Sequence, residues 1–176
     1  MSAMIELPIK EGVSVEIKGN EVETKGSLGS NRRKFNDALL KISKKENRII
    51  IDAVNEKALA KKAMKAENSM RREIENDMRG VTEHFERKML AIFAHFPITI
   101  EVKGNEVLIK NIIGERFPRS SRIVGSTKIE VKGQNIRVYG TSLDDVTQTA
   151  ANIRQACRMR NKDIRIFQDG LYYETE

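Results

Sequence analysis

The chain has 176 residues, of which 32 are Lys or Arg and 25 are Asp or Glu, so its formal net charge is +7. This excess favours a polyanionic partner, either nucleic acid or an anionic membrane surface. No run approaches the roughly 20 apolar residues of a membrane-spanning helix, and no signal peptide opens the chain. We therefore expect a soluble cytoplasmic protein, and the single Cys157 excludes an internal disulfide.

The sequence contains an internal repeat, because residues 13–29 recur at 98–114. Most aligned pairs that differ exchange one β-branched or apolar residue for another, which chance rarely produces. We predict a tandem duplication with modules at 1–80 and 81–176. The positions that recur identically are, in the first copy, Glu16, Lys18, Gly19, Asn20, Glu21, Val22, Lys25 and Gly29.

In the first module, apolar and polar residues alternate on both sides of a turn at 18–20, which predicts a β-hairpin. The β-branched run 48–54 is too short for a helix and indicates another strand. Apolar residues then step by three or four, which predicts an amphipathic helix over 56–79 that ends at Gly80. The apolar stripe consists of Leu59, Ala63, Ala66, Met70, Ile74 and Met78.

The connecting segment 81–97 fits two periods, because Val81, Phe85, Met89 and Phe93 suit either a helix or a long strand. Helical spacing alone slightly favours a helix that ends before Pro97, whereas the preceding Gly80 and the aromatic content permit a strand. Periodicity leaves both alternatives open.

The second module repeats the plan of the first, with a hairpin around 104–105 and strands at 128–132 and 135–139. A helix is predicted over 142–159, where Ser142 and Asp145 have the spacing of a capping box. Both modules then belong to the α+β class, with antiparallel strands packed on one helix. The helical stripe consists of Leu143, Val146, Ala150, Ile153 and Cys157.

Motifs of enzymes and metal sites are missing from the sequence. There is no glycine-rich phosphate loop, no Cys or His pair at metal spacing and no Gly-x-Ser-x-Gly elbow. His84 and His95 lack a Cys partner and are expected to be ordinary polar or packing residues. Asp144 and Asp145 fall in the first helical turn, where carboxylates offset the helix dipole. We expect no catalytic residues, metal, cofactor or small-molecule substrate, and a metal-dependent nuclease has no support.

Cations are concentrated near the C-terminus, where residues 154–165 hold five basic side chains against one acid. Arg predominates, and its planar guanidinium engages phosphate oxygens bidentately. A solvated helix face with cations at its C-terminus is the alternative reading. The five predicted RNA contacts are Arg154, Arg158, Arg160, Lys162 and Arg165.

A second basic patch follows the repeated glycine in each module, at 32–34 in the first copy and at Arg116, Arg119 and Arg122 in the second. The second copy also offers Phe117 as a stacking surface and the hydroxyls of residues 120 and 121. For the first copy, a plain exposed turn is an equally good interpretation. Aromatic residues make up only 5% of the chain, and no strand carries a base-stacking aromatic pair. The pattern favours a folded RNA recognised by shape and phosphates.

The rival interpretation is a protein-interaction module whose basic charge serves solubility. Its main support is the predicted helix 56–79, where basic and acidic residues alternate in a way that is typical of a solvated face. The two roles are compatible.

Four segments together resemble one family. They are NKDIRIFQDGLYY at 161–173, TQTAANIR at 147–154, GVTEHFERKM at 80–89 and AHFP at 94–97. In this order they resemble the L6 family of large-subunit ribosomal proteins, in its archaeal and eukaryotic form. The resemblance covers essentially the whole chain, including the duplication.

The resemblance implies a non-enzymatic constituent of the large ribosomal subunit that supports translation beside neighbouring ribosomal proteins. It implies binding to ribosomal RNA mainly through the second module, near the stalk base and the sarcin–ricin loop, and an extended segment at 81–96. The basic tail of the bacterial branch is not found, since the sequence ends in Glu-Thr-Glu. The RNA-facing residues that the resemblance implies are Gln148, Arg154, Arg158 and the stretch from Asn161 to Arg165, which includes Lys162. Gly170 and Tyr172 belong to the closing motif, and we predict that Tyr172 also contacts RNA.

Overall fold

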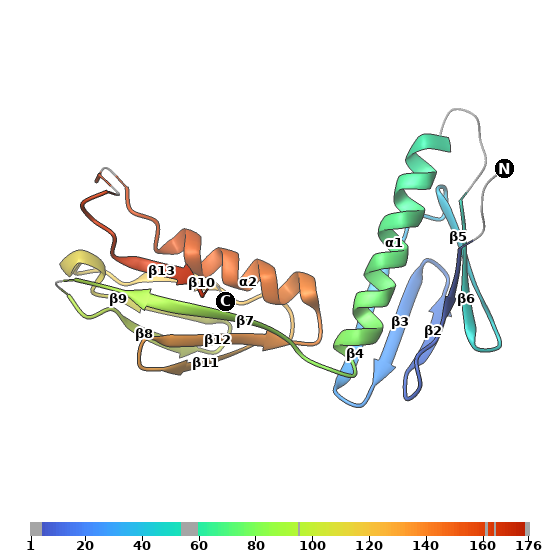
Figure 1. Cartoon of the computed structure of the whole chain (residues 1–176), viewed down its shortest axis with the longest axis horizontal. Coiled ribbons are helices and arrows are strands. Elements are labelled where there is room, and N and C mark those ends of the chain that lie inside the picture. Colours follow the sequence, from blue (N-terminus) through green and yellow to red (C-terminus); the bar gives the residue numbers. More distant parts are fainter. Residues whose placement is uncertain (1–4, 54–59, 95, 161, 164, 175–176) are drawn as a thin grey trace. The chain divides into compact units, whose positions relative to one another are not determined.

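The computed structural model describes residues 5–53, 60–94, 96–160, 162–163 and 165–174 (Figure 1). The chain divides into two compact units, Met1–His84 and Phe85–Glu176, which we call unit 1 and unit 2. Each contains one long helix and antiparallel strands, so the predicted α+β class is confirmed.

Unit 1 has two three-stranded antiparallel sheets, with strand orders β1-β6-β5 and β2-β3-β4. Its helix packs against strands of both sheets (Figure 1). The elements are β1 (Ile5–Pro8), β2 (Ser14–Lys18), β3 (Glu21–Gly26), β4 (Gly29–Lys34), β5 (Leu40–Lys45), β6 (Arg48–Ala53) and α1 (Ala60–Gly80).

The core of unit 1 confirms the predicted helical stripe where the structure describes it. Met70, Ile74 and Met78 of α1 are buried in one cluster with Ile49 and Ile51 of β6. The helix runs one residue beyond the predicted end and includes Gly80. The predicted residues 56–59 lie outside the described part of the chain.

Unit 2 repeats this arrangement with one additional strand. Its sheets have the orders β10-β9-β8 and β11-β12-β7-β13, and its helix packs against strands of both. The elements are β7 (Phe85–Ile92), β8 (Thr99–Lys103), β9 (Glu106–Lys110), the 3-10 turn η1 (Ile112–Gly114), β10 (Arg119–Arg122), β11 (Lys128–Lys132), β12 (Asn135–Gly140), α2 (Leu143–Ala156) and β13 (Gly170–Tyr173).

The connecting segment that sequence left open is a strand over β7 and a turn before it. β7 pairs antiparallel with β12 on one side and with β13 on the other, so both of its edges are satisfied within the sheet. Met89 and Ala91 face the core of unit 2 and are 1% and 2% exposed. The helical alternative is therefore wrong for 85–92.

The second helix begins as predicted and ends three residues early. The Ser142 side chain accepts a hydrogen bond from the Asp145 backbone N–H at 3.3 Å, which is the expected N-cap. The predicted end at residue 159 is wrong, because the Arg158 N–H bonds to the Gln155 carbonyl in a tightened final turn. Arg158 and Arg160 thus lie in irregular chain beyond α2, and not on the helix.

Candidate RNA-binding surface

Three irregular segments of unit 2 are joined by side-chain hydrogen bonds at one end of the unit. They are residues 93–97, 111–118 and 157–169, without 95, 161 and 164, and we call them the loop end. Asp169, which is 7% exposed, accepts a hydrogen bond from the Ala94 N–H at 3.0 Å. Asn111 donates its side-chain N–H to the Pro97 carbonyl at 3.1 Å. These links order the loop end before any ligand arrives, which lowers the entropic cost of binding.

Arg119 makes the third link, from the first residue of β10 to the end of α2. Its Nη1 donates to the carbonyls of Ala156 and Arg158, at 2.9 and 3.0 Å. Its Nε donates to Glu115 Oε2 at 2.8 Å and its Nη2 to the other oxygen of the same carboxylate. Donating these hydrogen bonds to the Glu115 carboxylate raises the pKa of Arg119, and the same contact lowers the pKa of Glu115.

These contacts change how Arg119 is interpreted. Four of the roughly five N–H groups of a guanidinium are already used inside unit 2. The side chain is only 21% exposed. Arg119 is therefore a positioning residue that satisfies the carbonyls left free at the end of α2.

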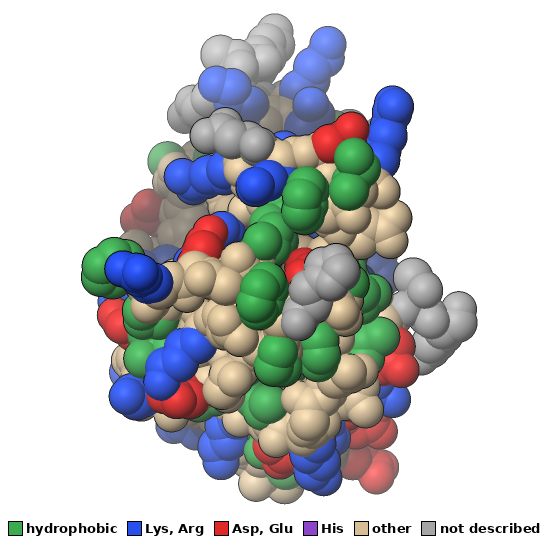
Figure 2. Space-filling model, turned by 90° about the vertical axis from the view of Figure 1, so that its left-hand side faces the viewer, with side chains coloured by type: hydrophobic (Ala, Val, Ile, Leu, Met, Phe, Trp, Pro, Cys, Tyr) green, Lys and Arg blue, Asp and Glu red, His purple; other side chains and the backbone are tan. Residues whose placement is uncertain are grey.

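The other predicted cations of unit 2 are exposed, and among the described residues none of them pairs with a carboxylate. Figure 2 views this end of unit 2 and shows Lys and Arg side chains around a group of hydrophobic ones. Lys162 has a ring contact, with its Nζ 5.0 Å from the centroid of Phe167. Asn161 lies outside the described residues. The exposed cations are Arg116, Arg122, Arg154, Arg158, Arg160, Lys162 and Arg165.

Asn152 of α2 links Gln148 to Arg122 by hydrogen bonds. Gln148 donates to the Asn152 side-chain oxygen at 2.8 Å, and the Asn152 side chain donates to the Arg122 carbonyl at 3.3 Å. Both predicted residues stay exposed, next to the contact between α2 and β10. Of the two hydroxyls predicted as phosphate donors, that of Ser120 is exposed, but Ser121 is 6% exposed and faces inward.

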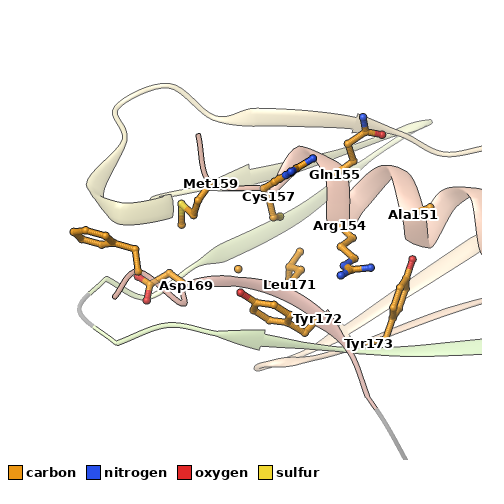
Figure 3. Close-up of a pocket in the computed structure, with 12 residues that line it drawn as sticks. Ala151, Arg154, Gln155, Cys157, Met159, Asp169, Leu171, Tyr172 and Tyr173 are labelled. Carbon is orange, nitrogen blue, oxygen red and sulfur yellow. The ribbon is translucent and has the colours of Figure 1, made fainter. Parts of the chain in front are cut away.

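A cavity of about 490 Å³ lies between the end of α2 and β13 (Figure 3). Arg154 extends from α2 toward Tyr173, and its guanidinium carbon is 5.2 Å from the ring centroid. Tyr172 lies along the cavity and donates its O–H to the Gln168 carbonyl at 3.1 Å. Burial raises the pKa of the Cys157 thiol, which also lines the cavity, to about 12, so it stays protonated and is a poor nucleophile.

The corresponding basic strand of unit 1 differs from this surface because acids neutralise it. Arg33 forms an ion pair with Asp77 of α1 at 2.9 Å. Arg32 pairs with Glu23 and Lys34 with Glu21, both at 3.1 Å. The sequence has basic residues at this place in both copies, and the structure shows that in unit 1 they are paired with acids.

Other kinds of site find no support in the part of the chain that the structure describes. There, no three His, Cys, Asp or Glu side chains come together as metal ligands. Nor does either helix, over its described residues, have the length and apolar character to cross a membrane. Asp144 and Asp145 occupy the first turn of α2, as predicted for helix capping.

The fold and this surface define a class: a duplicated α+β protein whose second unit, over its described residues, presents exposed cations without carboxylate partners. Comparison with known proteins narrows this class to one family. The sequence profile of the family described as ribosomal protein L6 matches residues 96–170. That range contains the anchors Asn111, Arg119 and Asp169 of the loop end.

Whole-chain relatives carry the name large ribosomal subunit protein uL6. The one from Methanobrevibacter smithii is 40% identical over 168 residues, which cover 95% of this chain and 92% of the relative. The one from Methanocella arvoryzae is 38% identical over 172 residues, covering 97% and 96%. The chain therefore belongs to the ribosomal protein L6 family, as its motifs indicated, and is a structural, non-enzymatic ribosomal protein.

Proposed function

We propose that the protein binds large-subunit ribosomal RNA through the loop end of unit 2, so that module 81–176 is the main RNA-binding module. The observation that supports this most is the set of exposed cations without carboxylate partners in the described part of unit 2. Those after α2, namely Arg158, Arg160, Lys162 and Arg165, follow a helix end that Arg119 holds in place. In our proposal Gln148, Asn161 and Tyr172 contribute polar contacts, as the family resemblance implied.

The site within the ribosome is also part of the proposal. We infer a position near the stalk base and the sarcin–ricin loop, in cytoplasmic ribosomes, from the resemblance of motifs along the chain. The basic surface is compatible with such a position because a folded RNA presents closely spaced phosphates to it.

The number of cations sets the expected salt dependence of RNA binding. If about five phosphates are neutralised, the slope of log affinity against log salt should be roughly −4 to −5, on the scaling of about −0.9 per phosphate for B-DNA. Replacing Arg158, Arg160 and Arg165 together by Ala should flatten the slope by about two to three. These residues follow α2 and are exposed, so their replacement leaves the fold intact.

The matched control removes three cations from unit 1, where acids already pair with them. Lys18→Ala, Arg32→Ala and Lys34→Ala in one variant change the net charge by the same amount. Filter binding of a large-subunit RNA fragment over a salt series should give the wild-type slope for this control. Equal slopes for both triple variants would show that total charge, and not the loop end, determines binding.

For unit 1 we propose contacts with neighbouring ribosomal proteins. Its β2–β3–β4 sheet carries paired charges, and Met64 of α1 is 58% exposed. Crosslinking in purified large subunits, with crosslinks mapped to peptides and nucleotides, tests both assignments. Nucleotide crosslinks concentrated in unit 1 would contradict them.

A further inference from the structure

Exposed apolar side chains gather at the loop end together with its cations. Phe117 is 85% exposed, Ile166 is 74% exposed and Phe96 is 44% exposed. Single exposed apolar residues are common, but these come from three segments that hydrogen bonds connect. Figure 2 shows the hydrophobic side chains as a group on this face, with Lys and Arg around them.

Phe117 stands on a loop that is fixed at both ends. On one side, Gly114 has φ +72°, a backbone conformation that favours glycine, and lies beside the ring of Phe96, 3.5 Å from where its Cβ would be. On the other side, Arg119 is held by Glu115 and by the end of α2. The exposure of Phe117 is thus imposed by ordered neighbours, and an exposed ring in a fixed position is suited to stacking.

The ligand that fits this surface must offer both negative charge and flat apolar faces. Continuous RNA duplex provides only the charge, since its base faces are stacked inside the helix. Unpaired nucleotides provide both, because their bases can stack on aromatic rings and guanidinium planes while their phosphates meet the cations. Arg116 is adjacent to Phe117 and is exposed, so both contacts are available within one nucleotide's reach.

We propose that the loop end binds unpaired nucleotides of an RNA loop or bulge, with Phe117 as the stacking surface. This proposal rests on the proposed RNA-binding function and narrows its substrate class. It also goes beyond the expectation from sequence of a folded RNA recognised by shape and phosphates, and gives the main role to Phe117, which the sequence had offered as a stacking surface.

The test compares two RNA probes of equal length and charge. One is a continuous duplex, and the other is the same duplex interrupted by an internal loop of adenosines. Because the phosphate number is matched, a difference in affinity reports the unpaired bases. The full-length protein should bind the interrupted probe roughly ten-fold more tightly, given a stacking contribution of about 1–3 kcal/mol per base.

Three substitutions at one exposed position identify the contact. Phe117→Ala should abolish the preference for the interrupted probe and leave affinity for the duplex unchanged. Phe117→Leu, which keeps apolar area but lacks a ring face, should lose most of the preference. The chain has no Trp, so Phe117→Trp supplies a single fluorescent reporter, which the interrupted probe alone should quench. Val102→Ala, at a 41% exposed position of β8, is the control and should behave as wild type.

The possible outcomes distinguish a failure of the stacking proposal from a failure of the proposed RNA-binding function. Equal, salt-dependent affinity for both probes would leave RNA binding in place and overturn the role of Phe117. An undiminished preference of Phe117→Leu for the interrupted probe would also overturn the stacking role of Phe117. A general apolar contact, of the kind made with a protein, would then explain the surface. Failure to bind either probe would contradict RNA binding itself.

Discussion

Replacement of Arg119 by Ala should destabilise unit 2 without removing a phosphate contact. The substitution leaves the carbonyls of Ala156 and Arg158 without their donor and breaks the ion pair with Glu115. Each hydrogen bond to a charged group contributes about 1.5–3 kcal/mol, and solvent can partly replace the donor at this end. The exposed ion pair adds less than about 1 kcal/mol. We expect a loss of about 2–3 kcal/mol in the free energy of unfolding of unit 2.

The composition of the chain supplies the assay. All three Tyr residues, Tyr139, Tyr172 and Tyr173, belong to unit 2, and the chain has no Trp. Intrinsic Tyr fluorescence during urea unfolding therefore follows unit 2 alone. With an m value of about 1–3 kcal/mol/M, the midpoint should fall by roughly 1–3 M. Arg119→Lys should recover only part of this, because one ammonium cannot reproduce the planar fork.

Two results would refute the reasoning about Arg119. A loss below about 0.5 kcal/mol would mean that solvent satisfies the carbonyls equally well. A salt slope of RNA binding flatter by about one would identify Arg119 as a phosphate contact. Acid provides a further check, because contact with Arg119 lowers the pKa of Glu115 in the folded state. That stabilisation is present above the unfolded pKa of about 4.3 and is lost as pH falls through the lower folded pKa, so the penalty of Arg119→Ala should shrink there.

Three further substitutions, one of them a control, test unit 1 by urea unfolding followed with far-ultraviolet circular dichroism. Burial, and then the charge of Asp52, raise the pKa of Glu67, which is 4% exposed. Its ionised form therefore destabilises the fold as pH rises above about 4.3. Glu67→Gln should stabilise unit 1 by about 1 kcal/mol at pH 7 and by less near pH 4. A gain in stability that does not depend on pH would contradict this explanation. Gly26→Ala should cost about 1–3 kcal/mol, because its Cβ would lie 2.7 Å from the Val81 carbonyl oxygen. Gly19→Ala, in open space at φ +60°, should cost only about 1 kcal/mol, and a larger effect there than at Gly26 would refute the packing argument.

Local sequence patterns were sufficient to predict the start of α2 and the two hairpins. The spacing of Ser142 and Asp145 predicted the start of α2, and the glycine turns at Gly19 and Gly104 predicted the two hairpins, whose φ values are +60° and +57°. The end of α2 could not be read in the same way. The donor to its last carbonyls comes from Arg119, which is 37 positions from Ala156.

Long-range pairing also explains why the connecting segment stayed ambiguous. Phe85, Met89 and Phe93 are spaced by four, which satisfies both a helix and one face of a strand. The choice depends on β12 and β13, which flank β7 in the sheet but follow it by tens of residues in the chain. No window of local sequence contains that information.

The candidate site was likewise predictable only in part from local sequence. A count of basic residues located the cations after α2, because charge is readable from composition. Whether a cation is available depends on acids elsewhere, as with Arg33 and its partner Asp77, 44 positions away. The sequence did offer Phe117 as a stacking surface, but its 85% exposure on a loop tied to neighbouring segments is known only from the structure.

The two units show how one scaffold can give a neutral and a cationic surface. Thr24 pairs with Asn31 in unit 1, and the repeat-equivalent Ile109 pairs with Arg119 in unit 2. In unit 1 the link from this strand to the helix is made by cations and carboxylates, chiefly Arg33 and Asp77. In unit 2 the link is made to backbone carbonyls, and the acids of α2 are confined to its first turn. In unit 2, Arg119 links this strand to the end of the helix, and it does so without a carboxylate of the helix. The cations that follow α2 therefore stay available to bind a polyanion.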